Sequence, residues 1–157
     1  MEVSEHARAL SAAERLLVYR PRSEAELRRR LKLKHFSQES IDSVVEELSR
    51  QKVLDDERFA KAYVDGKLLT RPLGLERLRR DLKGLGVAPE TAERALATAE
   101  LDEPEAVREL VGRHLNRLQG LPRVTIERRL LSIVRRRGFS SGLAFRVIGE
   151  LLDEDNQ

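Results

Sequence analysis

Residues 21–48 read PRSEAELRRRLKLKHFSQESIDSVVEEL, and this stretch decides the fold because its pattern occurs three times in the chain. A basic segment with leucines four residues apart is followed by an aromatic residue or a valine and then by an acidic segment. Shifts of 51 and 103 residues align its apolar positions with further apolar positions. The aligned sets are Leu27, Leu31, Phe36 and Val45; Leu78, Leu82, Val87 and Leu96; and Leu130, Val134, Phe139 and Ile148. Such a period predicts one supersecondary unit used three times.

Each copy is predicted to contain three helices, because helix starts and stops fall at matching positions. A proline follows the first helix in every copy, and the sequence Ser23-Glu24-Ala25-Glu26 forms a capping box that begins a second helix. A left-handed turn after the second helix is predicted at His35, Gly86 and Gly138. The predicted helices span residues 4–19, 24–34, 37–50, 56–70, 75–84, 88–100, 103–119, 124–137 and 140–153.

The predicted fold class is all-α, with three tandem three-helix repeats forming an elongated, curved array. No segment shows sustained period-two alternation, and the connections between the predicted helices are short. The repeats are predicted at residues 1–50, 51–101 and 102–157. Leu54 and Phe59 flank the start of the fourth helix as a hydrophobic staple, which predicts a structural role for Phe59.

Composition bounds the possible functions. The chain has 157 residues, of which 36% are charged and only 4% aromatic, and it has no cysteine. The absence of cysteine excludes disulfides, thiolate catalysis and cysteine zinc sites. The N-terminus has no apolar stretch of signal-peptide length and no segment approaches a membrane span, so a cytoplasmic location without a membrane partner is expected.

No motif for catalysis is found, so no enzymatic activity and no catalytic, cofactor or metal site are expected. The three histidines occupy unrelated positions, and HExxH, GxSxG, P-loop and dinucleotide patterns are absent. Gly84-Leu85-Gly86 is interpreted as a helix stop, and Asp55-Asp56 as capping carboxylates in preference to metal ligands.

Charge alternates in phase with the repeat, although the net charge is only +3. Residues 20–34 hold seven Lys or Arg against two Glu, whereas residues 39–57 hold two against seven. With the leucines facing inward, the cations of the second helices face outward. These cations, with their neighbours at the end of the last basic helix, are the predicted binding residues, here called the basic stripe. The basic stripe comprises Arg28, Arg29, Lys32, Arg79, Arg80, Lys83, Arg128, Arg129, Arg135, Arg136 and Arg137.

The basic stripe has two possible interpretations. A basic helix face is often merely solvated, but a cation recurs at Lys32, Lys83 and Arg135 in all three copies. Spaced cations suit a polyanion or an acidic protein groove, which favours a binding surface. Aromatic side chains are nearly absent from the basic helices, which argues against the reading of single-stranded bases.

The segments 21–31, 53–63 and 135–140 resemble the RecX family of recombination regulators, with LDDERFAKAY at residues 54–63 as the most specific match. The resemblance covers nearly the whole chain. It implies a non-enzymatic array of three-helix repeats that binds the RecA–DNA filament along its groove. The resemblance also implies that the protein inhibits RecA activities (ATPase, strand exchange and co-protease function) in recombination, DNA repair and the SOS response. Two features depart from the family pattern: His35 stands where glycine is usual, and the linker 73–76 is less basic.

The expected partners are the RecA filament and single- or double-stranded DNA. DNA is expected to bind weakly and without sequence specificity, and the protein is expected to be a monomer. Two alternatives from other classes remain open. Paired helices could form a helix-turn-helix transcription factor, or the array could be a scaffold that binds only protein. Inhibition by filament capping, groove coating or destabilised subunit contacts is equally compatible with the sequence.

Overall fold

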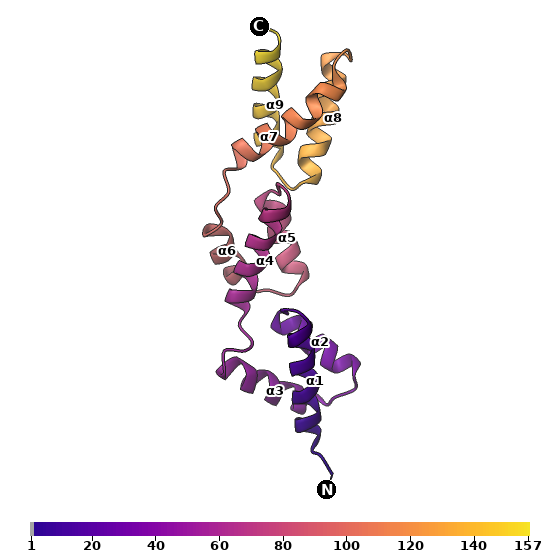
Figure 1. Cartoon of the computed structure of the whole chain (residues 1–157), viewed down its shortest axis with the longest axis vertical. Helices are drawn as coiled ribbons and strands as arrows, with labels where there is room; N and C mark the ends of the chain where they lie inside the picture. Colours follow the sequence, from indigo (N-terminus) through magenta and orange to yellow (C-terminus); the bar gives the residue numbers. More distant parts are fainter. Residues whose placement is uncertain (1) are drawn as a thin grey trace. The chain divides into compact units, whose positions relative to one another are not determined.

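A computed structural model describes residues 2–157, which contain nine α-helices, one short 3-10 helix and no β-strand. The prediction of an all-α fold is confirmed. The helices, shown in Figure 1, are α1 (Glu5–Tyr19), α2 (Glu24–Leu33), α3 (Gln38–Arg50), α4 (Asp56–Thr70), α5 (Leu75–Gly84), α6 (Pro89–Ala97), α7 (Glu103–Leu115), η1 (Asn116–Leu118), α8 (Arg123–Arg136) and α9 (Ser141–Asp155). None of the helices in the described part of the chain is long and apolar enough to cross a membrane.

The chain forms two compact units. The first unit extends to Tyr63 and also includes Asp81–Ala97, whereas the second comprises Val64–Arg80 and Thr98–Gln157. Helices α4 and α5 therefore contribute to both. The predicted repeat boundaries at residues 50 and 101 are not tested by this division and stay a prediction.

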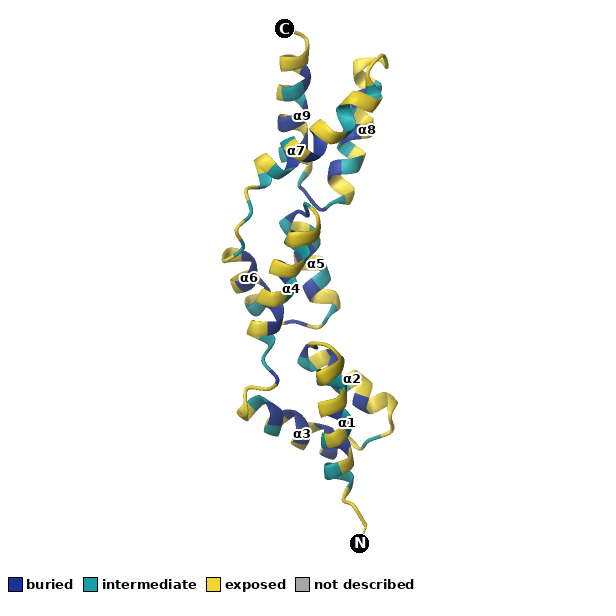
Figure 2. Cartoon of the chain, viewed as in Figure 1, coloured by how far each residue is buried: buried dark blue, intermediate teal, exposed yellow. Residues whose placement is uncertain are grey.

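In the first unit, α1, α2 and α3 pack against one another around an aliphatic core. The inward positions of the amphipathic helices alternate with exposed ones along each helix, as Figure 2 shows. Burial of these side chains supplies the main stabilisation of the helices. The core residues are Ala9, Ala13, Leu27, Leu31, Ile41, Val44, Val45, Leu48 and Leu54.

In the second unit, α7, α8 and α9 form the corresponding three-helix packing. Phe139, which the repeat aligns with Phe36, is 2% exposed and is the largest fully buried side chain. The core residues are Val107, Leu110, Val111, Ile126, Leu130, Val134, Phe139, Ala144, Val147, Ile148 and Leu152. Every apolar position of the third aligned set is thus buried.

The local signals act largely as predicted. The Ser23 hydroxyl accepts a hydrogen bond from the Glu26 amide, and the Glu26 carboxylate accepts one from the Ser23 amide, so the capping box is confirmed. Asp55 accepts from the amides of Glu57 and Arg58 and caps α4. The interpretation of Asp55 as a cap is therefore confirmed.

Some predicted helix ends are displaced. The helix predicted to run to residue 119 ends as α-helix at Leu115 and continues as η1, and α6 ends at Ala97 instead of near residue 100. Gly120, with φ +87°, turns the chain after η1, a turn that the sequence prediction missed. The tight 3-10 turn and this glycine redirect the chain before α8 begins at Arg123.

The left-handed turns at the ends of α2, α5 and α8 are confirmed, with φ 65° at His35, 78° at Gly86 and 87° at Gly138. The structure adds a second reason for the two glycines. A Cβ atom at Gly86 would overlap the side chain of Ala25, and one at Gly138 would overlap that of Arg77. His35 is exposed and carries its side chain in the same turn. Close packing, in addition to backbone conformation, therefore accounts for glycine at the two later positions.

These close approaches belong to two similar joints, one in each unit. In the first unit, the Ser23 hydroxyl donates to the Leu85 carbonyl at 2.5 Å, and the Glu24 amide donates to Asp56 at 2.9 Å. Because Asp56 is half-buried, desolvation raises its pKa, although the Glu24 amide opposes the shift. Asp56 thus caps α2, and not the helix that it begins.

In the second unit, the start of α5 meets the turn between α8 and α9 in the same way. The Gly74 amide donates to the Arg137 carbonyl at 2.8 Å, and the Leu75 amide donates to Glu103 at 2.7 Å. Each joint uses a carboxylate at the start of a first helix to satisfy an amide at the start of a preceding second helix. The joints hold the basic helices α5 and α8 in place.

Replacing Phe59 with alanine is expected to lower the free energy of unfolding by about 3 kcal/mol, near the lower end for a buried aromatic residue. Phe59 is 9% exposed, and its ring centroid lies 6.2 Å from that of Tyr63. Urea unfolding followed by circular dichroism measures the loss. Val18→Ala is the control, since Val18 is 87% exposed and should change stability little. Equal unfolding midpoints for the two variants would contradict a structural role for Phe59.

Candidate anion-binding interface

A groove of about 600 Å³ in the second unit brings together four residues of the predicted basic stripe. Arg80 comes from α5, whereas Arg128, Arg135 and Arg136 come from α8. Its remaining lining residues, Leu131 and Ser132, carry no charge. The groove therefore presents four guanidinium groups and no carboxylate.

The groove cations are oriented by the apolar residues on the opposite faces of α5 and α8. Leu78 on α5 and Leu130 and Val134 on α8 are fully buried, which turns the intervening arginines outward. The bond from the Gly74 amide to the Arg137 carbonyl ties the start of α5 to the end of α8. Arg128 and Arg135 lie seven residues apart, or roughly 10 Å along the helix axis.

The groove cations are available for an external anion. Arg80, Arg128, Arg135 and Arg136 are exposed, and none forms an ion pair with a described residue. Some other arginines of the second unit are neutralised; Arg108, for example, pairs with Glu150 and Glu154. Unpaired guanidinium groups on one groove attract phosphate or carboxylate and can bind either through two parallel hydrogen bonds.

Other predicted residues of the second unit do not line this groove. Arg79 and Arg129 are exposed on α5 and α8. Arg137 is half-buried at the end of α8, where its carbonyl accepts the bond from Gly74. Arg137 therefore belongs to the joint as well as to the predicted stripe.

The predicted residues of the first unit differ among themselves. Arg28 forms ion pairs with Glu24, at 3.0 Å, and Asp42, at 2.6 Å, so its charge is already neutralised. The bond from Arg28 lowers the pKa of Asp42, with a smaller contribution from Gln38. Arg29, Lys32 and Lys83 are exposed and form no ion pair with a described residue. Of the three cations at the recurring position, Lys32, Lys83 and Arg135, only Arg135 lines the groove.

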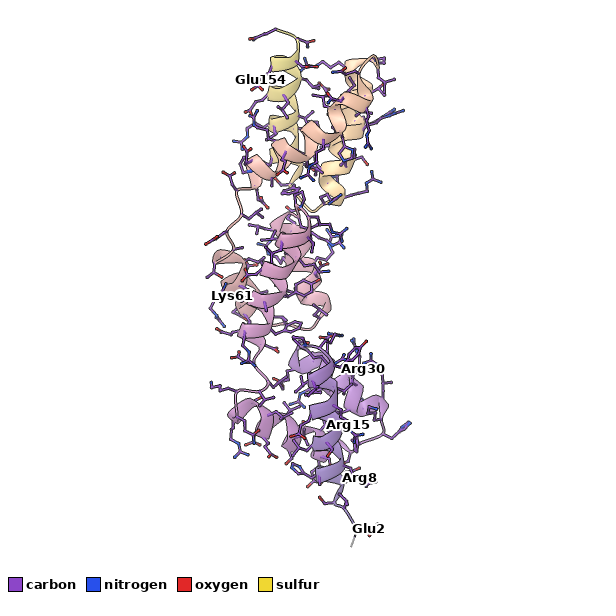
Figure 3. The ribbon with its side chains drawn as sticks, in the orientation of Figure 1. Glu2, Arg8, Arg15, Arg30, Lys61 and Glu154 are labelled. Atoms are coloured by element: carbon purple, nitrogen blue, oxygen red, sulfur yellow. The ribbon has the colours of Figure 1, made fainter. Side chains whose placement is uncertain are left out.

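Sequence reasoning missed a second group of cations in the first unit. Arg8 and Arg15 project from α1, where Figure 3 labels them, and line a cleft together with Arg22 and Lys34. The available signal was the seven-residue spacing of Arg8 and Arg15, which places them on one face of a helix. Arg8 and Arg15 belong to a first helix, whereas the predicted basic stripe lies on second helices.

The fold and these surfaces define an all-α protein of packed three-helix segments with cationic grooves. Residues 9–48 match the family model of the first three-helix domain of RecX, and residues 55–96 match that of the second. The chain belongs to the RecX family of regulatory proteins.

Relatives named regulatory protein RecX match over most of the chain. The relative from Thermobifida fusca is 33% identical over 96% of this chain and 82% of its own length. The relative from Amycolatopsis mediterranei is 36% identical over 88% of this chain and 80% of its own length. The relative from Streptomyces coelicolor is 33% identical over 98% of this chain and 81% of its own length.

Solved structures agree on the fold. The crystal structure of RecX from Lactobacillus salivarius superposes with a TM-score of 0.84 at 20% identity, covering 94% of this chain and 96% of the other. A second crystal structure of a regulatory protein RecX gives a TM-score of 0.81 at 23% identity, covering 93% of this chain and 72% of the other.

Proposed function

We propose that this protein binds the RecA–DNA filament in the cytoplasm and inhibits RecA activities, including its ATPase, without catalysing a reaction itself. The observation that carries the proposal is the groove of Arg80, Arg128, Arg135 and Arg136, in a chain of the RecX family. RecX relatives are named as regulatory proteins, and regulation requires a partner. The groove supplies the chemistry by which a polyanionic partner is held.

The charge of the groove suits DNA phosphates or an acidic surface of RecA. A filament repeats its binding surface, so weak contacts made by several parts of one chain add through effective concentration. The exposed Arg29, Lys32 and Lys83 of the first unit provide such further contacts. Neutralisation of phosphates releases counterions, which makes the affinity fall as salt rises.

The test is the DNA-dependent ATPase of RecA, measured with increasing amounts of the full chain. We expect the ATPase rate to fall as protein is added, and the inhibition to weaken as salt is raised. An unchanged ATPase rate at saturating protein would contradict the proposal. A heat-denatured sample of the same chain controls for additives in the preparation.

Titration with DNA alone separates this function from a sequence-specific DNA factor. If the four groove cations each neutralise one phosphate, log K should fall with log salt with a slope of about −3.6 on duplex DNA and about −2.8 on single strands. The affinity should not depend on base sequence, because phosphate contacts carry no sequence information. Tight binding to one selected sequence would favour the transcription-factor alternative.

A further inference from the structure

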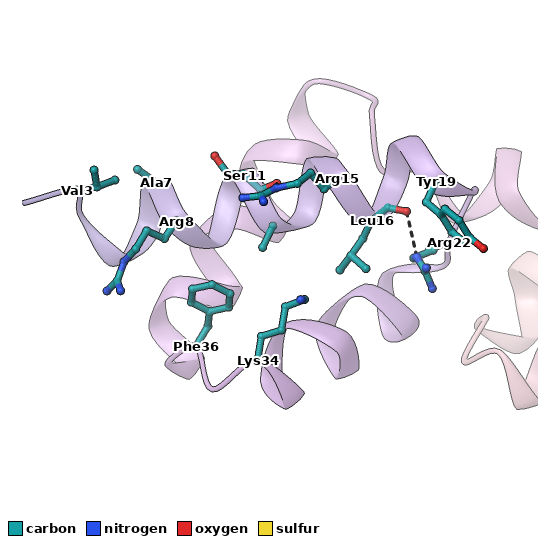
Figure 4. Close-up of a pocket in the computed structure, with 11 residues that line it drawn as sticks. Val3, Ala7, Arg8, Ser11, Arg15, Leu16, Tyr19, Arg22, Lys34 and Phe36 are labelled. Atoms are coloured by element: carbon teal, nitrogen blue, oxygen red, sulfur yellow. Dashed lines mark hydrogen bonds between the residues drawn. The ribbon is translucent and has the colours of Figure 1, made fainter.

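A cleft of about 580 Å³ lies between α1 and the end of α2, in the first unit and outside the groove already described. Figure 4 shows Arg15 on α1 opposite Lys34, with Arg8 at one end of the cleft and Arg22 beside Tyr19 at the other. No aspartate or glutamate lines it. The cleft therefore combines four cations with apolar and aromatic side chains.

Arg22 is the unusual member, because it is only 5% exposed and has no ion-pair partner among the described residues. Its Nε donates to the Leu16 carbonyl at 3.2 Å, but its two terminal nitrogens form no hydrogen bond with a described residue. Among the described residues, every fully buried side-chain nitrogen or oxygen has a hydrogen-bond partner, so the two unpaired nitrogens of Arg22 keep some contact with solvent. These donors are thus free to bind a ligand.

A buried guanidinium without a counter-ion is unfavourable, and arginine cannot relieve it by losing a proton. Burial lowers the pKa of Arg22, and the nearby cations Arg20 and Arg30 lower it further, whereas Glu26 and Tyr19 oppose the shift. Arg20 differs, because its guanidinium pairs with Glu26 at 2.8 Å. The bond to Leu16 explains why Arg22 is held at the end of α1, but it gives the guanidinium no direct ion-pair partner.

The lining indicates which kind of anion would compensate this charge. A carboxylate brings one negative charge, whereas a phosphate group brings up to two and accepts hydrogen bonds through three oxygens. Several cations around Arg22 therefore favour phosphate. Tyr19 is 82% exposed beside Arg22, and Phe36 is half-buried in the cleft wall, so a flat aromatic group would find a stacking surface.

We propose that this cleft binds a nucleotide, with its phosphates on Arg15, Arg22 and Lys34 and its base against Tyr19. The nucleotide is either free in solution or a unit of a single DNA strand, because both present the same chemistry. The site goes beyond the proposed function, since it lies on other helices than the groove of Arg80 and the α8 arginines.

Isothermal titration of the full chain with ADP, with pyrophosphate and with a 12-nucleotide oligothymidylate tests the proposal. The double variant Arg15→Gln/Lys34→Gln should weaken binding of the nucleotide probes by about 10-fold or more. Both side chains are exposed, so the fold should be retained. Arg50→Gln/Lys52→Gln is the matched control, because it removes the same charge from exposed residues of the same unit outside the cleft lining. Tyr19→Ala should weaken the binding of ADP by about 10-fold and leave the binding of pyrophosphate unchanged, because pyrophosphate has no base to stack.

If ADP binds and the cleft variants weaken its binding, the cleft is a site for free nucleotides. If only the oligothymidylate binds and the cleft variants weaken its binding, the cleft is a site for a DNA strand. No binding of any probe, or equal loss in the cleft and control variants, would overturn the proposal. Cleft-dependent binding of polyglutamate without nucleotide binding would also overturn it. Variants of the groove should leave ADP binding unchanged, so failure of this site and failure of the RecA proposal are separable.

Discussion

Gly138→Ala is expected to lower the free energy of unfolding by about 4 kcal/mol. The substitution places a Cβ at φ +87°, which costs roughly 1–2 kcal/mol, and drives it into Arg77, where overpacking adds roughly 1–3 kcal/mol. The clash is severe because the new atom would lie 2.6 Å from the backbone nitrogen of Arg77, which cannot move without α5. Urea unfolding followed by circular dichroism measures the effect.

Two other glycines separate the two causes. Gly120 also has φ +87°, but nothing lies within 4 Å of a Cβ placed there, so Gly120→Ala should cost only about 1 kcal/mol. A Cβ at Gly74 would overlap the Gly138 carbonyl and lie 2.6 Å from the Phe139 nitrogen without a left-handed backbone, so Gly74→Ala reports the steric cost alone. Equal losses for Gly138→Ala and Gly120→Ala would show that the joint tolerates an added methyl group.

Reversal of charge in the groove should weaken inhibition of RecA by about 100-fold. The variant is Arg128→Glu/Arg135→Glu/Arg136→Glu, in which each exposed contact is worth about 1 kcal/mol at most and each reversal also adds repulsion. All three side chains are exposed, so the helices should stay folded. The measurement is the protein concentration that halves the RecA ATPase rate, with circular dichroism to verify folding.

A matched variant distinguishes the groove from net charge. Arg71→Glu/Arg117→Glu/Arg146→Glu changes the charge by the same amount in the same unit, at exposed arginines that do not line the groove. It should retain most of the inhibition. Lys32→Glu/Lys83→Glu/Arg135→Glu tests the recurring position instead. If the groove variant inhibits as well as the matched variant, the groove is not the binding surface.

Much of the fold follows from the sequence because its signals are local. The capping box at Ser23 and Glu26, the inward leucines of α2, α5 and α8, and the left-handed turn at Gly138 each depend on neighbours within a few residues. Three aligned copies then strengthen each local signal. The end of α7 differs from the prediction because a 3-10 turn replaces the α-helix after Leu115.

The candidate sites depend on side chains that are distant in the sequence. Helical periodicity placed Arg28 and Arg135 alike on outward faces, but Asp42 of the next helix neutralises Arg28 and no described carboxylate pairs with Arg135. Similarly, nothing near Arg22 in the sequence shows that its guanidinium is buried without a direct ion-pair partner among the described residues.

The sequence by itself thus determined the all-α class, the three-helix repeat, most helix bounds and the outward cations, because hydrophobic period, caps and breakers act over a few residues. Only the tertiary structure decided that Arg80 shares a groove with Arg128, Arg135 and Arg136, which of the cations are neutralised, and why Gly138 cannot carry a side chain. These properties arise where separate helices pack together, and packing depends on distances between residues that no local pattern encodes.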